Sequence, residues 1–199
     1  MSVVRRLLSA QDASCNFLTP FGRGFVESRY VRRSPTKVTA YLSSHNDCAL
    51  GCKMCHLTQQ RKTAPSPNPL AVRIDSYRQQ LRTVLRHHSG GPCRLNVAFM
   101  AKGDAFANPS LVRHFGRLYD ELDAEASLHG SFSQTRLCVS SILPKIIGHR
   151  LLDEVLCAPH HLYYSMYSAN PEWRNAWLPG ALPVQQALDK LRTYQDNSG

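Results

Sequence analysis

Hydrophobic and polar side chains follow different periods in different parts of this chain, and the periods predict its elements. Residues 25–31 alternate between apolar and polar side chains, as a half-exposed strand does. Residues 94–101 are almost continuously apolar after their start, which is typical of a parallel strand covered on both faces. Residues 110–126 have apolar side chains near the 3.6-residue spacing of a helix. The chain therefore combines both kinds of element.

Strands and helices are predicted to alternate after about residue 37. A hairpin over 17–33, turning at 21–25, precedes them, and a proline-rich break interrupts them at 62–70. The alternation predicts an α/β fold with a parallel sheet, right-handed crossovers and about four βα units. The predicted strands are 37–44, 94–101, 135–141 and 161–168, and the predicted helices are about 74–88, 110–126, 145–157 and 184–194.

Positive charge is concentrated at the front of the chain. The protein has 199 residues, enough for a domain with a hydrophobic core, and a formal net charge of +10. Residues 1–37 contain seven Lys or Arg residues against two acidic ones. A basic front end suits a polyanion such as RNA, although charge alone also fits a merely basic protein. We expect residues 1–36 to form a basic segment with the hairpin and residues 37–199 to form the core.

No apolar run approaches the length of a membrane span. The apolar part of the N-terminus is also too short and too interrupted for a secretory signal. We therefore expect a cytoplasmic protein with no membrane partner.

Three cysteines follow the predicted strand over 37–44. Cys48, Cys52 and Cys55 have the spacing C-x3-C-x2-C, and Gly51 between them permits a tight turn. Thiolates are soft ligands that suit iron–sulfur clusters or zinc. Three thiolates leave one iron of a [4Fe–4S] cluster without a protein ligand, and that iron can bind a small molecule.

Zinc is the alternative interpretation of these cysteines. A structural zinc site normally has four protein ligands, often supplied as two separated C-x2-C pairs. No second pair exists in this sequence, so His45 or His56 would have to be the fourth ligand.

The cysteine spacing resembles that of the radical S-adenosylmethionine (SAM) superfamily. Ser43-Ser44 before the cysteines and Gln59-Gln60 after them are similar to the RlmN/Cfr family, which methylates a ring carbon of adenosine in RNA. The resemblance runs from about Phe17 to the last residue. It implies a partial radical-SAM (β/α) barrel, preceded here by the short N-terminal β-hairpin.

This resemblance also implies site residues and cofactors. Cys48, Cys52 and Cys55 are the implied ligands of a [4Fe–4S] cluster that binds SAM. Gly103-Asp104 resembles a Gly-Glu-Pro-like motif that holds the amino group of SAM, with aspartate in place of glutamate. The other implied SAM-contacting residues are Ser140, Ser165, Met166 and Tyr167. A helix-capping role is an alternative for Ser140.

Glu27 is the implied catalytic residue. Members of the family have a glutamate after a hairpin glycine, proposed as a proton acceptor, and Val26-Glu27 matches that pattern. The alternative is a solvated carboxylate on a strand. The resemblance further implies RNA (rRNA or tRNA) as partner, and an electron donor such as flavodoxin or ferredoxin.

Two features of the family's methyltransferases are missing. Their upstream cysteine falls at Tyr41, which has no thiol, and the region of their C-terminal cysteine does not exist in this chain. The chain is then a fragment or reduced product of a longer protein, or a divergent enzyme. Three functions remain open: RNA methyl transfer, another radical SAM reaction, or a non-catalytic zinc- or cluster-binding RNA module.

Overall fold

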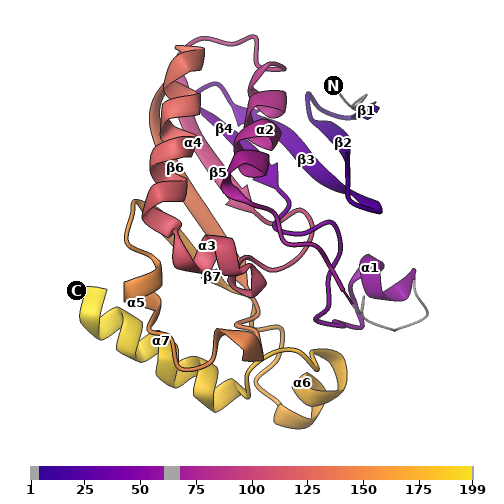
Figure 1. The fold of residues 1–199 in the computed structure, drawn as a ribbon, viewed down its shortest axis with the longest axis vertical. Coiled ribbons are helices and arrows are strands. Elements are labelled where there is room, and N and C mark those ends of the chain that lie inside the picture. The colour runs from indigo at the N-terminus through magenta and orange to yellow at the C-terminus, as the bar shows by residue number, and fades with distance from the viewer. Residues whose placement is uncertain (1–4, 61–67, 199) are drawn as a thin grey trace.

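A seven-stranded sheet forms the centre of the computed structural model, which describes residues 5–60 and 68–198. The strands lie side by side in chain order, from β1 to β7 (Figure 1). Their bounds are β1 Arg5–Leu8, β2 Cys15–Phe21, β3 Gly24–Ser34, β4 Lys37–Leu42, β5 Cys93–Phe99, β6 Phe132–Ser141 and β7 His160–Tyr164.

The first half of the sheet is antiparallel. β2 and β3 form the predicted hairpin, in which Phe21 pairs with Gly24 at the closed end. β3 also pairs with β4, so the hairpin joins the same sheet as the strands that follow. β1 pairs with β2 and is an element that the sequence pattern does not predict.

The second half, β4 to β7, is parallel, and helices connect its strands. Helix α2 packs on β3 and β4, helix α4 packs on β6, and the two helices also pack on each other (Figure 1). This arrangement confirms an α/β fold. The helices are α1 His56–Gln59, α2 Ile74–Leu85, α3 Pro109–Arg113, α4 Phe115–His129, α5 Leu152–Val155, α6 Pro171–Trp177 and α7 Val184–Ser198.

The hydrophobic core lies between the parallel strands and helices α2 and α4. Alternate residues of each strand are completely buried there, such as Val38 and Leu42 on β4 and Leu95 and Val97 on β5. Because successive side chains of a strand point to opposite faces, the residues between them face away from the helices.

Two predicted helices were wrong in detail. The helix predicted over 110–126 is two helices, since His114, at φ −135° and ψ +36°, separates α3 from α4. The helix predicted over 145–157 is a 3-10 turn, Lys145–Ile147, followed by the short α5. The Lys145 N–H donates to the Gly180 carbonyl at 2.8 Å, and Pro144 forms a bridge with Ala181. This pairing with a distant segment replaces the first helical turn.

Other predicted elements are present, with ends that differ from the prediction by up to four residues. The strands over 37–44, 94–101, 135–141 and 161–168 correspond to β4, β5, β6 and β7, and the helices over 74–88 and 184–194 correspond to α2 and α7. Most of the proline-rich break at 62–70 lies outside the described residues. No helix in the described part of the chain is long and apolar enough to cross a membrane.

Candidate cofactor-binding site

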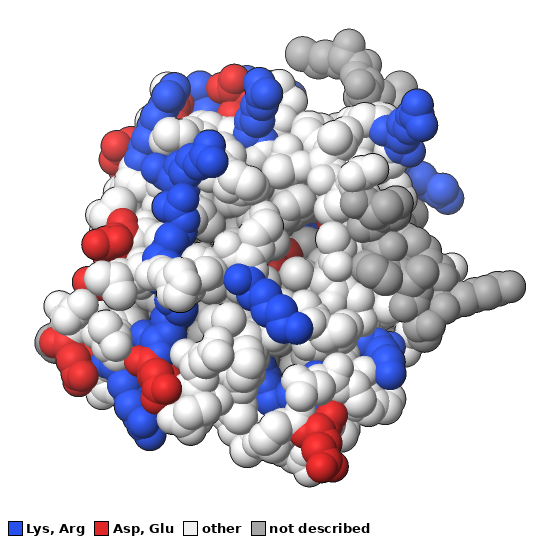
Figure 2. Space-filling model, turned by 60° about the horizontal axis from the view of Figure 1, so that its bottom comes forward, with Lys and Arg blue, Asp and Glu red and all other residues white. Residues whose placement is uncertain are grey.

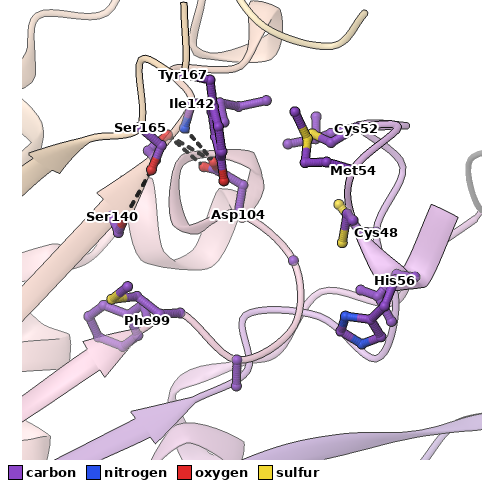
Figure 3. A pocket seen from close by; sticks show the side chains of 17 residues that line it. Cys48, Cys52, Met54, His56, Phe99, Asp104, Ser140, Ile142, Ser165 and Tyr167 are labelled. Carbon is purple, nitrogen blue, oxygen red and sulfur yellow. Dashed lines mark hydrogen bonds between the residues drawn. The ribbon is translucent and has the colours of Figure 1, made fainter. Parts of the chain in front are cut away.

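A cavity of about 450 Å³ lies at the carboxyl ends of the parallel strands. The loop after β4 forms one wall, and the segments that follow β5, β6 and β7 form the other. Figure 3 shows Cys48, Cys52 and Met54 on one side, with Asp104, Ser165 and Tyr167 across from them. Open α/β sheets bind ligands at this edge because loops from several strands meet there.

All three predicted metal ligands line this cavity. The Cys55 N–H donates to the Cys52 carbonyl at 3.0 Å, and Cys55 is then the N-cap of α1. Gly51 has φ +66°, the left-handed value expected from its place in the motif. The Asp47 carboxylate accepts a hydrogen bond from the Cys48 N–H at 2.9 Å. The loop therefore turns all three thiols toward one space.

None of the three thiols is in a disulfide, and two of them strongly favour the protonated form. Burial raises the pKa of Cys48 to about 11 and that of Cys52 to about 12. The Asp104 charge and the neighbouring cysteines raise both values further. A cation in the cavity would reverse this balance, because bound metal stabilises the thiolate.

This donor set fits an iron–sulfur cluster. Among the residues that the structure describes, no three His, Cys, Asp or Glu side chains are placed to hold one metal ion. In a cubane each thiolate binds a different iron, so three ligands lie farther apart than around a single ion. Of the two histidines considered for zinc, His56 is exposed at the cavity, whereas His45 is buried against Gly103 and Ser44 and does not line the cavity.

Asp104 joins the loop after β5 to the end of β6. Its Oδ1 accepts from the Phe106 N–H at 2.9 Å and from the Ser141 hydroxyl at 2.8 Å. Its Oδ2 accepts from the Ile142 N–H at 3.1 Å. Burial raises the pKa of Asp104 to about 6, and these hydrogen bonds oppose that rise. These hydrogen bonds favour the ionised carboxylate, which faces the thiols across the cavity.

Backbone geometry requires glycine just before this aspartate. Gly103 has φ +80°, and a Cβ there would lie 2.5 Å from His45 Nδ1 and 2.8 Å from Ser44 Oγ. A side chain would therefore push the loop away from the strand end that precedes the cysteines.

The ends of β6 and β7 supply further predicted residues. Ser140 and Ser165 line the cavity, and their hydroxyl oxygens are 3.2 Å apart. Tyr167 also lines it, with 64% of its surface exposed and φ +58°, an unusual value for a residue with a Cβ. Met166 does not line the cavity, and its carbonyl accepts a hydrogen bond from the Arg174 guanidinium.

Several lining residues were missed by the sequence analysis. Ser141 lies next to the predicted Ser140 and is the one that hydrogen-bonds Asp104. The end of β5 adds Phe99 and the exposed Met100, which the sequence presented only as part of an apolar strand. Their position directly before Gly103-Asp104 is the signal that would have found them.

A small hydrophobic cluster supports the cysteine loop from outside. Ile142, Leu178 and Ala181 are buried together, and Leu50 and Met54 of the loop pack against them. The Lys53 N–H donates to the Trp177 carbonyl at 2.9 Å. The segment around α6, which the sequence analysis did not predict as a helix, therefore holds the loop in place.

Two residues singled out in the sequence lie elsewhere. Glu27, on β3, is not among the lining residues, and its carboxylate accepts from the Asn16 amide at 2.9 Å. Tyr41 is half-buried within β4, opposite Arg29 and Ala98, and does not line the cavity either. The cavity itself brings together three thiols, one carboxylate and the hydroxyls of three serines and a tyrosine, a combination suited to a metal cluster with a polar ligand beside it.

Comparison with known proteins finds relatives along the whole chain. A Streptomyces griseus protein named probable dual-specificity RNA methyltransferase RlmN is 28% identical over 211 residues, covering 100% of this chain and 53% of that protein. A protein of the same name from Streptomyces coelicolor is 28% identical, with 100% of this chain and 53% of that protein aligned. Another from Rhodococcus opacus is 29% identical, with 85% of this chain and 45% of that protein aligned. The chain thus spans about half the length of the curated relatives it matches. No protein-family model matches it.

Proposed function

Because this chain is a relative of the RlmN proteins, we propose that it is a radical SAM enzyme that acts on RNA. One observation supports this most directly. Three cysteines that form no disulfide share a single cavity with Asp104 and the serines at the ends of β6 and β7. That cavity lies at the edge of the sheet where barrel enzymes have their chemistry.

In this proposal Cys48, Cys52 and Cys55 hold a [4Fe–4S] cluster through their thiolates. When bound, the cluster supplies the electron that cleaves SAM into methionine and a 5′-deoxyadenosyl radical, and a donor such as flavodoxin or ferredoxin replaces that electron. The protein contributes binding, orientation and exclusion of water. Met54, packed beside Cys52, provides an apolar surface next to the cluster.

The opposite wall is proposed to bind SAM. Asp104 attracts the methionine amino group by its negative charge, and Gly103 lets the backbone approach closely. Ser140 and Ser165 are hydroxyl donors and acceptors for the nucleoside part. Tyr167 is an exposed ring at the mouth of the cavity, where it packs against the adenosyl group.

We also propose that β4 to β7 and their helices are an incomplete (β/α) barrel of the radical SAM type. Four parallel strands in chain order, each followed by helical segments, support this interpretation. The cysteine loop follows the first of these strands, and Asp104 follows the second.

The reaction after SAM cleavage has two candidates. Methyl transfer to a ring carbon of adenosine is the one that the relationship suggests. Tyr41 favours a different radical reaction, because it occupies the position of a cysteine that the family's methyltransferases use.

Glu27 is proposed as a proton acceptor for the RNA substrate. It lies outside the lining residues of the cavity, so we expect no part for it in SAM cleavage. Glu27→Gln should then leave the yield of 5′-deoxyadenosine unchanged and lower the yield of modified RNA. A fall in both yields, measured in one reaction by liquid chromatography, would contradict this assignment.

Anaerobic reconstitution with iron and sulfide, followed by a 5′-deoxyadenosine assay, tests the SAM-cleaving activity. Mass analysis of RNA from cells with and without the protein then separates the two candidate reactions. A new methyladenosine supports methyl transfer, another new modification supports the second candidate, and unchanged RNA contradicts the RNA substrate.

A further inference from the structure

The sheet contains an unusual excess of positive charge. Across its seven strands the one acidic residue is Glu27, on β3, within the described part of the chain. Its Lys and Arg residues number eight: Arg5, Arg6, Arg29, Arg32, Arg33, Lys37, Arg94 and Arg136.

Three of these cations meet on the face of the sheet that the helices leave uncovered. Lys37, Arg94 and Arg136 lie on the neighbouring parallel strands β4, β5 and β6, and all three line a hollow of about 170 Å³. Lys37 pairs in register with Arg94. The residues next to them on each strand face the helices, so these side chains face the other way.

The charge in this hollow is not neutralised locally. None of the three cations forms an ion pair with a carboxylate among residues 5–60 and 68–198. The Arg136 guanidinium donates to His161 Nε2 at 2.8 Å, a partner without negative charge. Glu27, the one acidic residue on the described strands, accepts a hydrogen bond from the Asn16 amide.

Parallel sheets normally have both faces covered. Here Lys37, Arg94 and His161 are exposed, and half of the Tyr163 surface is exposed. A cover for this face must tolerate cations, which excludes an apolar partner. A second copy of the chain would bring like charges together, so the complementary cover is a polyanion.

We propose that this hollow binds the phosphate backbone of a single RNA strand. Its volume is below the roughly 300–1,000 Å³ of small-molecule pockets, which suits one phosphate group of a longer chain. Asn96 and Gln134 add neutral hydrogen-bond donors beside the cations, and Tyr163 adds an aromatic surface for a base.

The hollow and the cofactor cavity lie on the same two strands. Arg136 and Ser140 of β6 are four residues apart on one face, and His161 and Ser165 have the same spacing along β7 and just beyond it. At about 3.3 Å per residue this separation is ~13 Å. One strand of RNA can therefore span both places, so the inference rests on the proposed function and gives that function a substrate path.

Lys and Arg side chains elsewhere on the surface would attract RNA less specifically. Figure 2 shows the end of the molecule with the loops, where Lys and Arg side chains are interspersed with Asp and Glu. Arg73, Arg113 and Arg117 line a groove of about 640 Å³ on the helical side, and Asp75 lines the same groove. This second group offers a matched control.

The test measures binding of a fluorescently labelled single-stranded RNA oligonucleotide at several salt concentrations. In the triple variant Lys37→Gln, Arg94→Gln, Arg136→Gln we expect affinity at low salt to fall at least tenfold. The slope of log K against log salt should fall by about 2, because each phosphate contact on a single strand contributes ~0.7. The control Arg73→Gln, Arg113→Gln, Arg117→Gln removes the same charge and should keep most of the affinity.

Equal losses in both variants, or no loss in the first, would overturn the proposal. So would a first variant that keeps its RNA affinity but loses binding to anionic vesicles or loses self-association. Thermal unfolding checks that the substitutions leave the fold intact. The 5′-deoxyadenosine assay separates the two claims. If the wild-type protein does not cleave SAM, the proposed function is contradicted. The RNA titration tests the binding of RNA in the hollow independently of that result.

Discussion

Asp104 is the residue whose surroundings define the SAM side of the cavity. Its carboxylate connects the loop after β5 to the end of β6 and puts a negative charge opposite the thiols. We expect Asp104→Ala to weaken SAM binding at least tenfold. A hydrogen bond to a charged group is worth about 1.5–3 kcal/mol, and ~1.4 kcal/mol is a factor of ten. Isothermal titration calorimetry of reconstituted protein measures the change.

The variant Ser141→Ala tests whether SAM binding depends on the charge of Asp104 or on the hydrogen bonds that hold its carboxylate in place. The variant removes the hydroxyl that donates to both carboxylate oxygens but keeps the carboxylate. SAM binding should weaken less than in Asp104→Ala. An Asp104→Ala protein that holds its cluster and binds SAM like wild type would show that the amino group is bound elsewhere.

His45 makes stability depend on pH below neutrality. Burial lowers the pKa of His45 to about 4 from an ordinary value near 6.5. Between these values the unfolded chain binds a proton that the folded protein does not, so stability is lost as pH falls through this window. From pH 7 to pH 4.5 this histidine should reduce the free energy of unfolding by about 2 kcal/mol.

Urea unfolding of protein without added iron, at several pH values, measures this dependence. His45→Gln should flatten the curve between pH 6.5 and pH 4, whereas the same change at the exposed His149 should not. Parallel curves for wild type and His45→Gln would mean that His45 titrates normally.

Among the elements, the segment from α6 to Gly180 fixes the cysteine loop. A Cβ at Gly180 would lie 2.8 Å from the Leu50 carbonyl oxygen and 3.0 Å from the Leu50 Cα, both backbone atoms of that loop. Gly180→Ala must therefore move the loop. We expect a destabilisation of about 1–3 kcal/mol, typical of overpacking, and less iron bound per chain.

The matched control is Gly91→Ala, because a Cβ there meets no atom within 4 Å. Iron and sulfide are assayed after anaerobic reconstitution of both variants. If Gly180→Ala binds as much iron as Gly91→Ala, the contact between this segment and the loop does not control the cluster site.

Strands β2 to β7 were predictable from sequence because their apolar pattern is local, whereas the short β1 was not. The helix expected over 145–157 failed because residues 143–145 pair with residues 180–182, a contact that no short window reveals. Long-range polar contacts were equally hidden. The buried Asn108 amide donates to the carbonyls of Ser44 and Val72 and so fixes the start of the cysteine loop.

Of the candidate site, the thiols and the Gly103-Asp104 loop were predictable because their spacing is itself the chemical signal. Which side chains near these motifs line the cavity was harder to predict. Met166 lies between two lining residues but does not line the cavity itself, and Ser141 rather than Ser140 donates a hydrogen bond to Asp104.

At the scale of the whole molecule, the sheet separates two kinds of chemistry. The carboxyl ends of its parallel strands meet at the thiol-lined cavity, and the hollow of Lys37, Arg94 and Arg136 lies toward their other ends. The antiparallel β1 to β3 extend the same sheet and carry its other five Lys and Arg residues. A nucleic acid strand crossing the open face would approach the cavity from that side.

The proposed function requires an iron–sulfur cluster that binds SAM, and electron paramagnetic resonance of the reduced, reconstituted protein tests for this cluster directly. Wild-type protein should give a cluster signal that changes when SAM is added. The variant Cys48→Ala, Cys52→Ala, Cys55→Ala should give none, whereas Cys157→Ser, at an exposed cysteine outside the cavity, should behave like wild type. A wild-type protein that binds no iron, or a signal that SAM leaves unchanged, would contradict the account.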